Sequence, residues 1–306
     1  MLRFFLIINI ILCLWLPLTG ELAPSAFVDI GYGARASGMS KAFTGVADDA
    51  SAIVWNPAGL VQIKKREILG MHANQKNLIS YDFAAAAIPF KGGAVLGAGI
   101  IHSGDLALTE ITGMVSFAQT LTEIPKIGNL PKGINIGVTY KIRSADFGNN
   151  TDGGPDRVTG DANGYGFDFG LLYGFSEKSA LGISIRDFYS SLYWDTSTSG
   201  RYEESVPMQY VMGISYRNPD SGLIVSFDFD SYGKVRTGFE DVIGKIIALR
   251  AGIKLDTKES FEQKNEYSVG VGIYHFNLGL LDFSFDASYS IEKIADTIKF
   301  SSSIRF

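Results

Sequence analysis

The chain has 306 residues, and its 27 basic and 32 acidic side chains give a formal net charge of −5. Hydrophobic residues make up 46% and charged residues only 19%, whereas charged residues are about 25% of a typical soluble chain. This composition excludes a disordered polyelectrolyte, and the acidic balance argues against a nucleic-acid-binding protein. With one cysteine and three histidines, neither a disulfide framework nor a thiolate zinc cluster is expected, and no cofactor is predicted.

The first 20 residues are typical of a signal peptide. A short basic start ends at Arg3, an apolar run covers Phe4–Leu16, and Pro17 closes the run. This run is too short for a membrane-spanning helix, which needs about 20 apolar residues, but it fits a signal-peptide core. We expect cleavage after Gly20 and export of the chain; an uncleaved anchor is the alternative.

Residues 21–62 do not alternate between apolar and polar side chains and are rich in small residues. A short helix is predicted within Ala34–Val46. A second is predicted over Ala50–Val54, capped by Asp48 or Asp49 and ended before Pro57. A compact segment of this kind before a barrel suits a plug in the lumen, and we call residues 21–62 the hatch.

Residues 63–306 alternate with a period of two, the strongest signal in the sequence. At the end of the chain, for example, Ile298 and Phe300 alternate with Lys299 and Ser301. Fourteen strands are predicted, and twelve is the alternative because 234–240 is weak. They cover 66–75, 78–89, 94–102, 107–121, 132–143, 164–175, 179–188, 206–217, 221–230, 234–240, 247–256, 266–275, 278–291 and 296–306.

Alternation alone also fits a secreted β-sandwich. Predicted strands of about 10–12 residues are longer than the usual 5–6 of soluble sheets and match tilted membrane strands. The second face carries glycine, serine and charged residues, which suits a lumen, and aromatic residues gather at strand ends. The fold prediction is therefore an all-β transmembrane antiparallel barrel of about fourteen strands with a small helical or irregular hatch in its lumen.

Other chemistry has weaker support in the sequence. Asp48 and Asp49 form a carboxylate pair, and a cap and solvated loop explain it better than catalysis. Four acidic residues in the predicted loop 144–163 have oxygen ligands for calcium but not the EF-hand spacing. No nucleophile, base and acid occur in a supporting motif, so an enzyme is not predicted.

Several motifs carry a family resemblance. In the hatch they are Gly33–Met39 (GARASGM), Ala47–Ala50 (ADDA) and Trp55–Leu60 (WNPAGL), and in the strands Ala162–Tyr173 (ANGYGFDFGLLY) and Leu181–Ile185 (LGISI). With the terminal aromatic Phe306, they closely resemble PorV/PorQ-type proteins of the FadL-like (OMPP1/FadL/TodX) outer-membrane family. The resemblance covers nearly all of the exported chain and implies a fourteen-strand barrel with an N-terminal hatch in the bacterial outer membrane.

The resemblance implies two possible functions. FadL-like members pass hydrophobic molecules such as long-chain fatty acids, and PorV-like members take part in protein secretion. Passage of small hydrophobic compounds is the leading prediction, and a non-transporting secretion or assembly component is the alternative. Candidate ligand contacts are Phe43, Trp55, Asn56 and Pro57 in the hatch. Expected partners are outer-membrane lipid, the barrel-assembly machinery through Phe306, a hydrophobic ligand and, for the alternative, secretion components.

Overall fold

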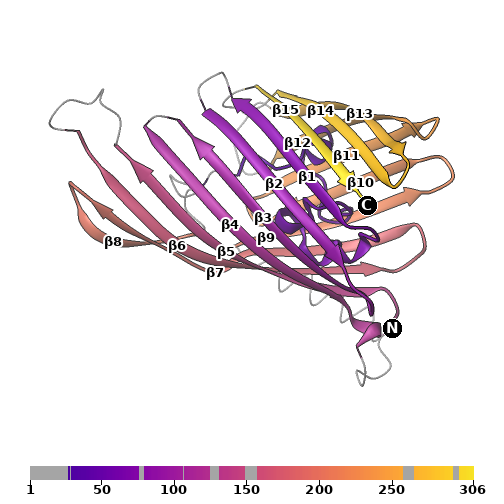
Figure 1. The fold of residues 1–306 in the computed structure, drawn as a ribbon, viewed down its shortest axis with the longest axis horizontal. Coiled ribbons are helices and arrows are strands. Elements are labelled where there is room, and N and C mark those ends of the chain that lie inside the picture. The colour runs from indigo at the N-terminus through magenta and orange to yellow at the C-terminus, as the bar shows by residue number, and fades with distance from the viewer. Residues whose placement is uncertain are drawn as a thin grey trace.

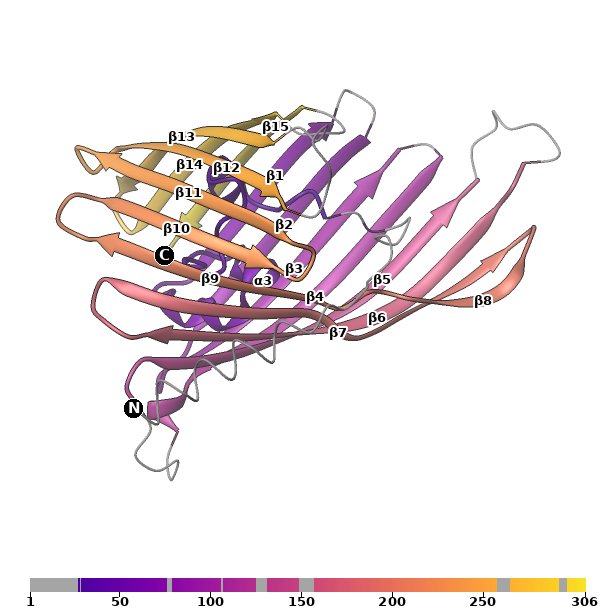
Figure 2. The same ribbon diagram turned by 180° about the vertical axis from the view of Figure 1, so that it is seen from behind.

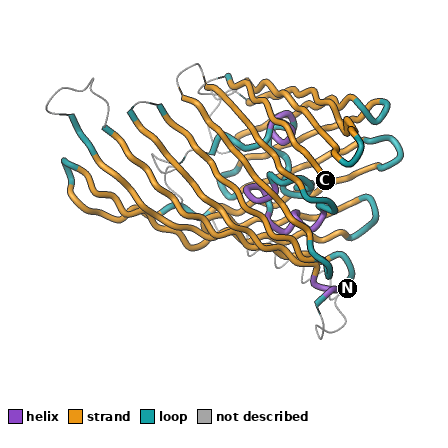
Figure 3. The backbone as a smooth tube through the Cα atoms, in the orientation of Figure 1, coloured by secondary structure: helices purple, strands orange, loops and turns teal. Residues whose placement is uncertain are grey.

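The computed structural model describes residues 27, 29–75, 79–105, 107–124, 131–148, 157–257, 265–291 and 296–306. Strands dominate, and they run side by side around a barrel with short helices inside it (Figure 1, Figure 3). The helices are α2 (Ala34–Gly38), α3 (Ala52–Trp55), η1 (Pro57–Gln62) and η2 (Leu121–Glu123). None of the helices in these ranges is long and apolar enough to span a membrane. The strands are β1 (Glu67–Gln75), β2 (Ile79–Pro89), β3 (Ala94–Gly104), β4 (Leu108–Thr120), β5 (Ile134–Phe147), β6 (Gly160–Gly174), β7 (Ser179–Thr196), β8 (Gly200–Ser205), β9 (Gln209–Asn218), β10 (Leu223–Asp230), β11 (Lys234–Ile243), β12 (Ile247–Asp256), β13 (Glu266–Leu278), β14 (Leu281–Ile291) and β15 (Thr297–Arg305).

Antiparallel pairing closes the barrel. The first and last strands pair, with Glu67 opposite Arg305, and β6 pairs with β7 to complete the circle. Both β8 and β9 pair with β7, β8 along its second half and β9 along its first, so these two segments share one position in the wall. The closed antiparallel barrel therefore has 14 strands, which confirms the predicted fold and count and makes the twelve-strand alternative wrong.

The two faces of the wall differ as the alternation predicts. In β15, Ile298 and Phe300 are 50% and 58% exposed on the outer face, while Lys299 and Ser301 are buried inside. Large exposed apolar side chains recur around the outer wall in the same way. An apolar outer band over a polar interior is the pattern of a barrel surrounded by lipid.

The wall is longer on one side of the barrel than sequence analysis predicts. Residues 189–205 were expected to be a loop, but β7 continues to Thr196 and returns as β8. Likewise, β5 extends to Phe147 and β6 starts at Gly160, which shortens the predicted loop 144–163. Strands β5 to β8 consequently project beyond the others at one end (Figure 1, Figure 2). We call this end the far rim, and the end that carries Arg66 and Phe306 the C-terminal rim.

A bulge in β7 interrupts the alternation near its middle. The register with β6 shifts between Phe167 and Phe169, and Asp187 has a positive φ of 51°. Phe188 and Tyr189 are consecutive, yet both are exposed on the outer face. The predicted strand ended at residue 188 because this bulge breaks the period of two.

The described part of the hatch, which is Phe27 and residues 29–62, lies within the barrel, where its helices are enclosed by the strands (Figure 2). Ala34, Met39, Phe43 and Leu60 have no exposed surface. The first helix ends at Gly38, much earlier than the predicted limit of Val46, because Ser40 and Lys41 adopt positive φ angles of 51° and 67°. The second helix, α3, starts at Ala52 with Ser51 at its N-cap position, two residues later than predicted, and Asp49 instead accepts from the Ser51 N–H at 2.9 Å in the turn before the helix.

Glycines of the wall allow the hatch backbone to pack directly against the strands. A Cβ atom added at any of seven inward-facing glycines would lie between 2.2 and 3.1 Å from a hatch atom. These glycines are Gly137, Gly170, Gly182, Gly213, Gly238, Gly252 and Gly270. At all of them except Gly270 the distance is below 3.0 Å, which real Cβ atoms essentially never reach, so the glycines fix where the hatch can sit.

Candidate functional site

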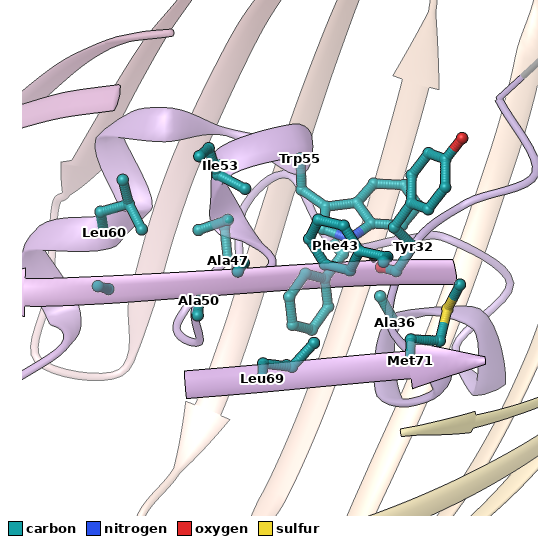
Figure 4. Close-up of a cluster of buried hydrophobic side chains, with 14 of the residues drawn as sticks. Tyr32, Ala36, Phe43, Ala47, Ala50, Ile53, Trp55, Leu60, Leu69 and Met71 are labelled. Carbon is teal, nitrogen blue, oxygen red and sulfur yellow. Dashed lines mark hydrogen bonds between the residues drawn. The ribbon is translucent and has the colours of Figure 1, made fainter. Parts of the chain in front are cut away.

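Two of the predicted ligand contacts, Phe43 and Trp55, form the centre of the hatch. Their rings meet edge to face with centroids 6.2 Å apart, and Trp55 Nε1 donates a hydrogen bond to the Tyr32 carbonyl at 2.8 Å. Figure 4 shows both side chains in the buried apolar cluster beside Tyr32, close to strand β1, which carries Leu69 and Met71. Phe43 is fully buried and Trp55 is 3% exposed, so both stabilise the hatch.

The other two predicted ligand contacts, Asn56 and Pro57, lie where the hatch meets the barrel wall. The Asn56 side-chain amide donates to the carbonyls of Thr44 at 2.9 Å and Leu171 at 3.1 Å, and its oxygen accepts from the Ala58 N–H at 3.2 Å. Extended backbone at Asn56 ends α3 before Pro57, as predicted. This hydrogen bonding gives the Asn-Pro pair a structural role; ligand contact by the four predicted residues stays a prediction.

A buried ionic network holds the hatch against β11. Arg35 forms a bidentate pair with Glu240, at 2.8 and 2.9 Å, and also contacts Asp48 and Asp49. Asp48 pairs further with Arg217 of β9 at 2.6 Å. Burial raises the pKa of the Asp48 carboxyl, but Arg217 and Arg35 outweigh this effect and hold the pKa well below its usual range. Asp48 and Asp49 are therefore anchors of the hatch and not a solvated loop.

A cavity of about 120 Å³ lies between the hatch and the inner faces of β3, β4, β5, β7 and β9. Its apolar lining comes from the hatch and from β3 and β4, through Phe27, Tyr32, Val54, Ile101 and Met114. Its polar lining comes from the same strands and from β5, β7 and β9 and includes Ser103, Glu110, Thr112, Lys141, Arg143, Arg186, Asp187 and Gln209. This volume is of the size that holds one aromatic ring, since an engineered cavity of about 150 Å³ binds benzene.

The three cations that face this cavity all have carboxylate partners. Lys141 lies 2.7 Å from Asp168, and Arg143 lies 2.7 Å from Asp187. Arg186 lies 3.2 Å from Asp29 and stacks over the Trp55 ring at 5.3 Å. Ion pairs of this kind recur elsewhere in the lumen, where Arg250 of β12 pairs with Glu240 of β11 at 2.6 Å.

On the other side of the hatch, a second cavity of about 550 Å³ opens at the C-terminal rim. Asp48, Gln62, Lys64 and Arg217 are among the residues that line it. The hatch therefore separates two cavities, and its charged anchor contacts the larger one.

Sequence reasoning missed the cavity residues Phe27, Tyr32 and Glu110. The alternation places Glu110 on the inner face of β4, but the register that brings it beside the hatch depends on the β3–β4 pairing. Among the described residues, no group of three or more histidine, cysteine or acidic side chains could hold a metal ion. Of the four acidic residues that sequence analysis weighed as calcium ligands, Asp152 and Asp156 lie outside the described residues.

The comparisons with known proteins support the fold. No protein-family model matches the chain, and a search of curated proteins finds no match. Solved structures do match. The chain is similar to the CymD monoaromatic hydrocarbon channel, with a TM-score of 0.62 and 17% identity over 91% of this chain and 97% of that one.

Two further structures are similar in the same way. The Pseudomonas putida toluene transporter TodX matches with a TM-score of 0.62 and 12% identity, over 90% of this chain and 99% of that one. A Pseudomonas aeruginosa FadL homologue matches with a TM-score of 0.60 and 12% identity, over 90% and 98%. At these identities the likeness establishes a shared barrel fold.

Proposed function

We propose that this protein is an outer-membrane channel for small hydrophobic compounds. The observation that carries the proposal is the cavity next to the hatch, where Phe27, Tyr32, Ile101 and Met114 provide an apolar surface beside polar and charged side chains. An open water-filled pore has no need of such a surface. Here a hatch fills the barrel and leaves a space the size of one aromatic ring.

The printed functions of the similar structures support this choice. CymD is a monoaromatic hydrocarbon channel and TodX a toluene transporter, and both share the barrel fold of this chain. The small cavity favours single-ring compounds over long-chain fatty acids as the first ligand bound, since long chains need a longer apolar surface than these side chains provide.

The location follows from the wall. Its apolar outer face needs lipid around it, and only closed barrels and helices can span a bilayer with all backbone groups paired. Export by cleavage of residues 1–20 is part of the proposal, although these residues lie outside the described ranges. Phe306, which exchanges backbone hydrogen bonds with Arg66 at the C-terminal rim, would be read by the barrel-assembly machinery.

Uptake by intact cells tests the proposal. A porin-deficient Gram-negative host expressing the chain should take up labelled toluene several times faster than the same host with an empty vector. Heat-dependent gel migration would establish that the barrel is folded in the membranes of the host that expresses it. Equal uptake by the two hosts, with the folded barrel present, would contradict a channel function and favour the secretion alternative.

A further inference from the structure

One wall of the ring-sized cavity is formed by a buried carboxyl group whose hydrogen bonds with the described residues come from neutral donors. Glu110 is 7% exposed, and its two oxygens accept from the Phe27 N–H at 2.7 Å and from Ser103 Oγ at 3.0 Å. A carboxylate has about four acceptor positions, and these two described donors fill about half of them. Among the described residues, no cation forms an ion pair with Glu110, in contrast to the acids that pair with Lys141, Arg143 and Arg186.

The remaining acceptor capacity lies beside apolar and aromatic surface. Glu110, Tyr32 and Phe27 line the same cavity, and Met114, four residues along β4, lines it as well. A ligand that fits this space can therefore place a ring against the apolar side chains and a donor against Glu110. Asp29 also lines the cavity and adds a second carboxyl group.

The charges around the cavity decide which polar group the ligand carries. Lys141, Arg143 and Arg186 are each paired with a carboxylate, and the carboxyl groups of Asp29, Glu110 and Asp187 line the same cavity, so an anionic ligand would meet like charges there. A neutral donor meets no such repulsion. A hydrogen bond to a charged acceptor is also stronger than one between neutral groups.

We propose that Glu110 selects small single-ring aromatic compounds that carry a hydroxyl or amino donor, of the phenol type, over the corresponding hydrocarbons. The inference rests on the proposed channel function and deepens it by naming a substrate class. Phe27 N–H and Ser103 Oγ each bond one oxygen of the Glu110 carboxyl group and so orient it, and the ligand's donor would bond a further acceptor position on these oxygens.

Phenol and toluene form a matched pair of probes, since they differ by a hydroxyl in place of a methyl group. In the porin-deficient host, uptake above the empty-vector level should be about tenfold or more greater for phenol than for toluene, the ratio for one hydrogen bond to a charged group. Glu110→Leu should remove that preference and leave toluene uptake at or above the wild-type level, and Glu110→Gln should give an intermediate ratio. Glu203→Leu, on the exposed strand β8, is the control and should keep the wild-type ratio.

Three results would overturn the inference. They are equal uptake of phenol and toluene by the wild-type protein, equal loss of both in Glu110→Leu, and uptake of benzoate that exceeds uptake of phenol. In each case, uptake of the probes at a rate above that of the empty-vector host would still support the channel function. If no probe entered the expressing host faster than the empty-vector host, the channel function itself would be contradicted.

Discussion

Gly137→Ala tests whether the hatch is held by direct packing of its backbone on the wall. A Cβ atom at this position of β5 would lie 2.4 Å from Pro57 C and Ala58 N of the hatch, about 1 Å short of an ordinary contact. The backbone atoms cannot rotate away as a side chain can, so the hatch or the strand has to move. Overpacking of this kind costs about 1–3 kcal/mol.

The matched control is Gly113→Ala on the adjacent strand β4, where an added Cβ meets no atom within 4 Å. Urea unfolding in detergent micelles should show that Gly137→Ala lowers the free energy of unfolding by about 1–3 kcal/mol. The control should stay within about 0.5 kcal/mol of the wild type. Planar-bilayer conductance gives an independent readout, because a displaced hatch opens the lumen to ions in Gly137→Ala alone. Equal stability and equal conductance of the two variants would refute close packing at the glycines.

Three further changes probe the contacts that seat the hatch. Glu240→Gln breaks the bidentate pair with Arg35 and should lower the free energy of unfolding by about 3–5 kcal/mol in the same urea assay. An unchanged urea midpoint would show that Arg35 holds the hatch without Glu240. Asn56→Ala leaves the Thr44 and Leu171 carbonyls without their side-chain donor and should lower the free energy of unfolding by about 1–3 kcal/mol; a cost no greater than that of Asn163→Ala, at an exposed position of β6, would contradict the anchoring role. Because the pKa of Asp48 is depressed in the folded protein, its stabilising effect is complete above the usual aspartate pKa of about 4 and is lost as the pH falls further. Conductance should therefore rise below about pH 4, and this rise should be smaller in Asp48→Asn; an identical acid response of both proteins would exclude Asp48 as its cause.

The alternation of apolar and polar side chains predicts the barrel well because the two faces of each strand have different surroundings. Lipid favours apolar side chains on the outer face, and the hatch-filled lumen favours small, polar or charged ones on the inner face. The same logic explains the missed hairpin of β7 and β8. Its residues lie beyond the main wall, where the outer face has no need to be apolar, and Asp187 shifts the phase before it begins. A period-two search loses the strand at that point.

The hatch was predictable as a segment but not in its detailed contacts. Its motif residues Phe43, Trp55 and Asn56 were chosen as ligand contacts, and the structure gives them packing and hydrogen-bonding roles. The cavity instead combines Tyr32 and Phe27 of the hatch with Glu110 and Met114 of the wall. Residues so far apart in sequence meet only through strand register and the position of the hatch, neither of which is encoded by local periodicity.

The central claim is that small hydrophobic compounds pass through the cavity beside the hatch. The most direct test fills that cavity with Thr112→Trp, on the inner face of β4, and compares it with Ile111→Trp, which places the same ring on the outer face where Ile111 is 41% exposed. Initial toluene uptake should fall to the empty-vector rate in Thr112→Trp and stay near the wild-type rate in Ile111→Trp. Undiminished uptake by a folded Thr112→Trp barrel would show that the compounds take another route.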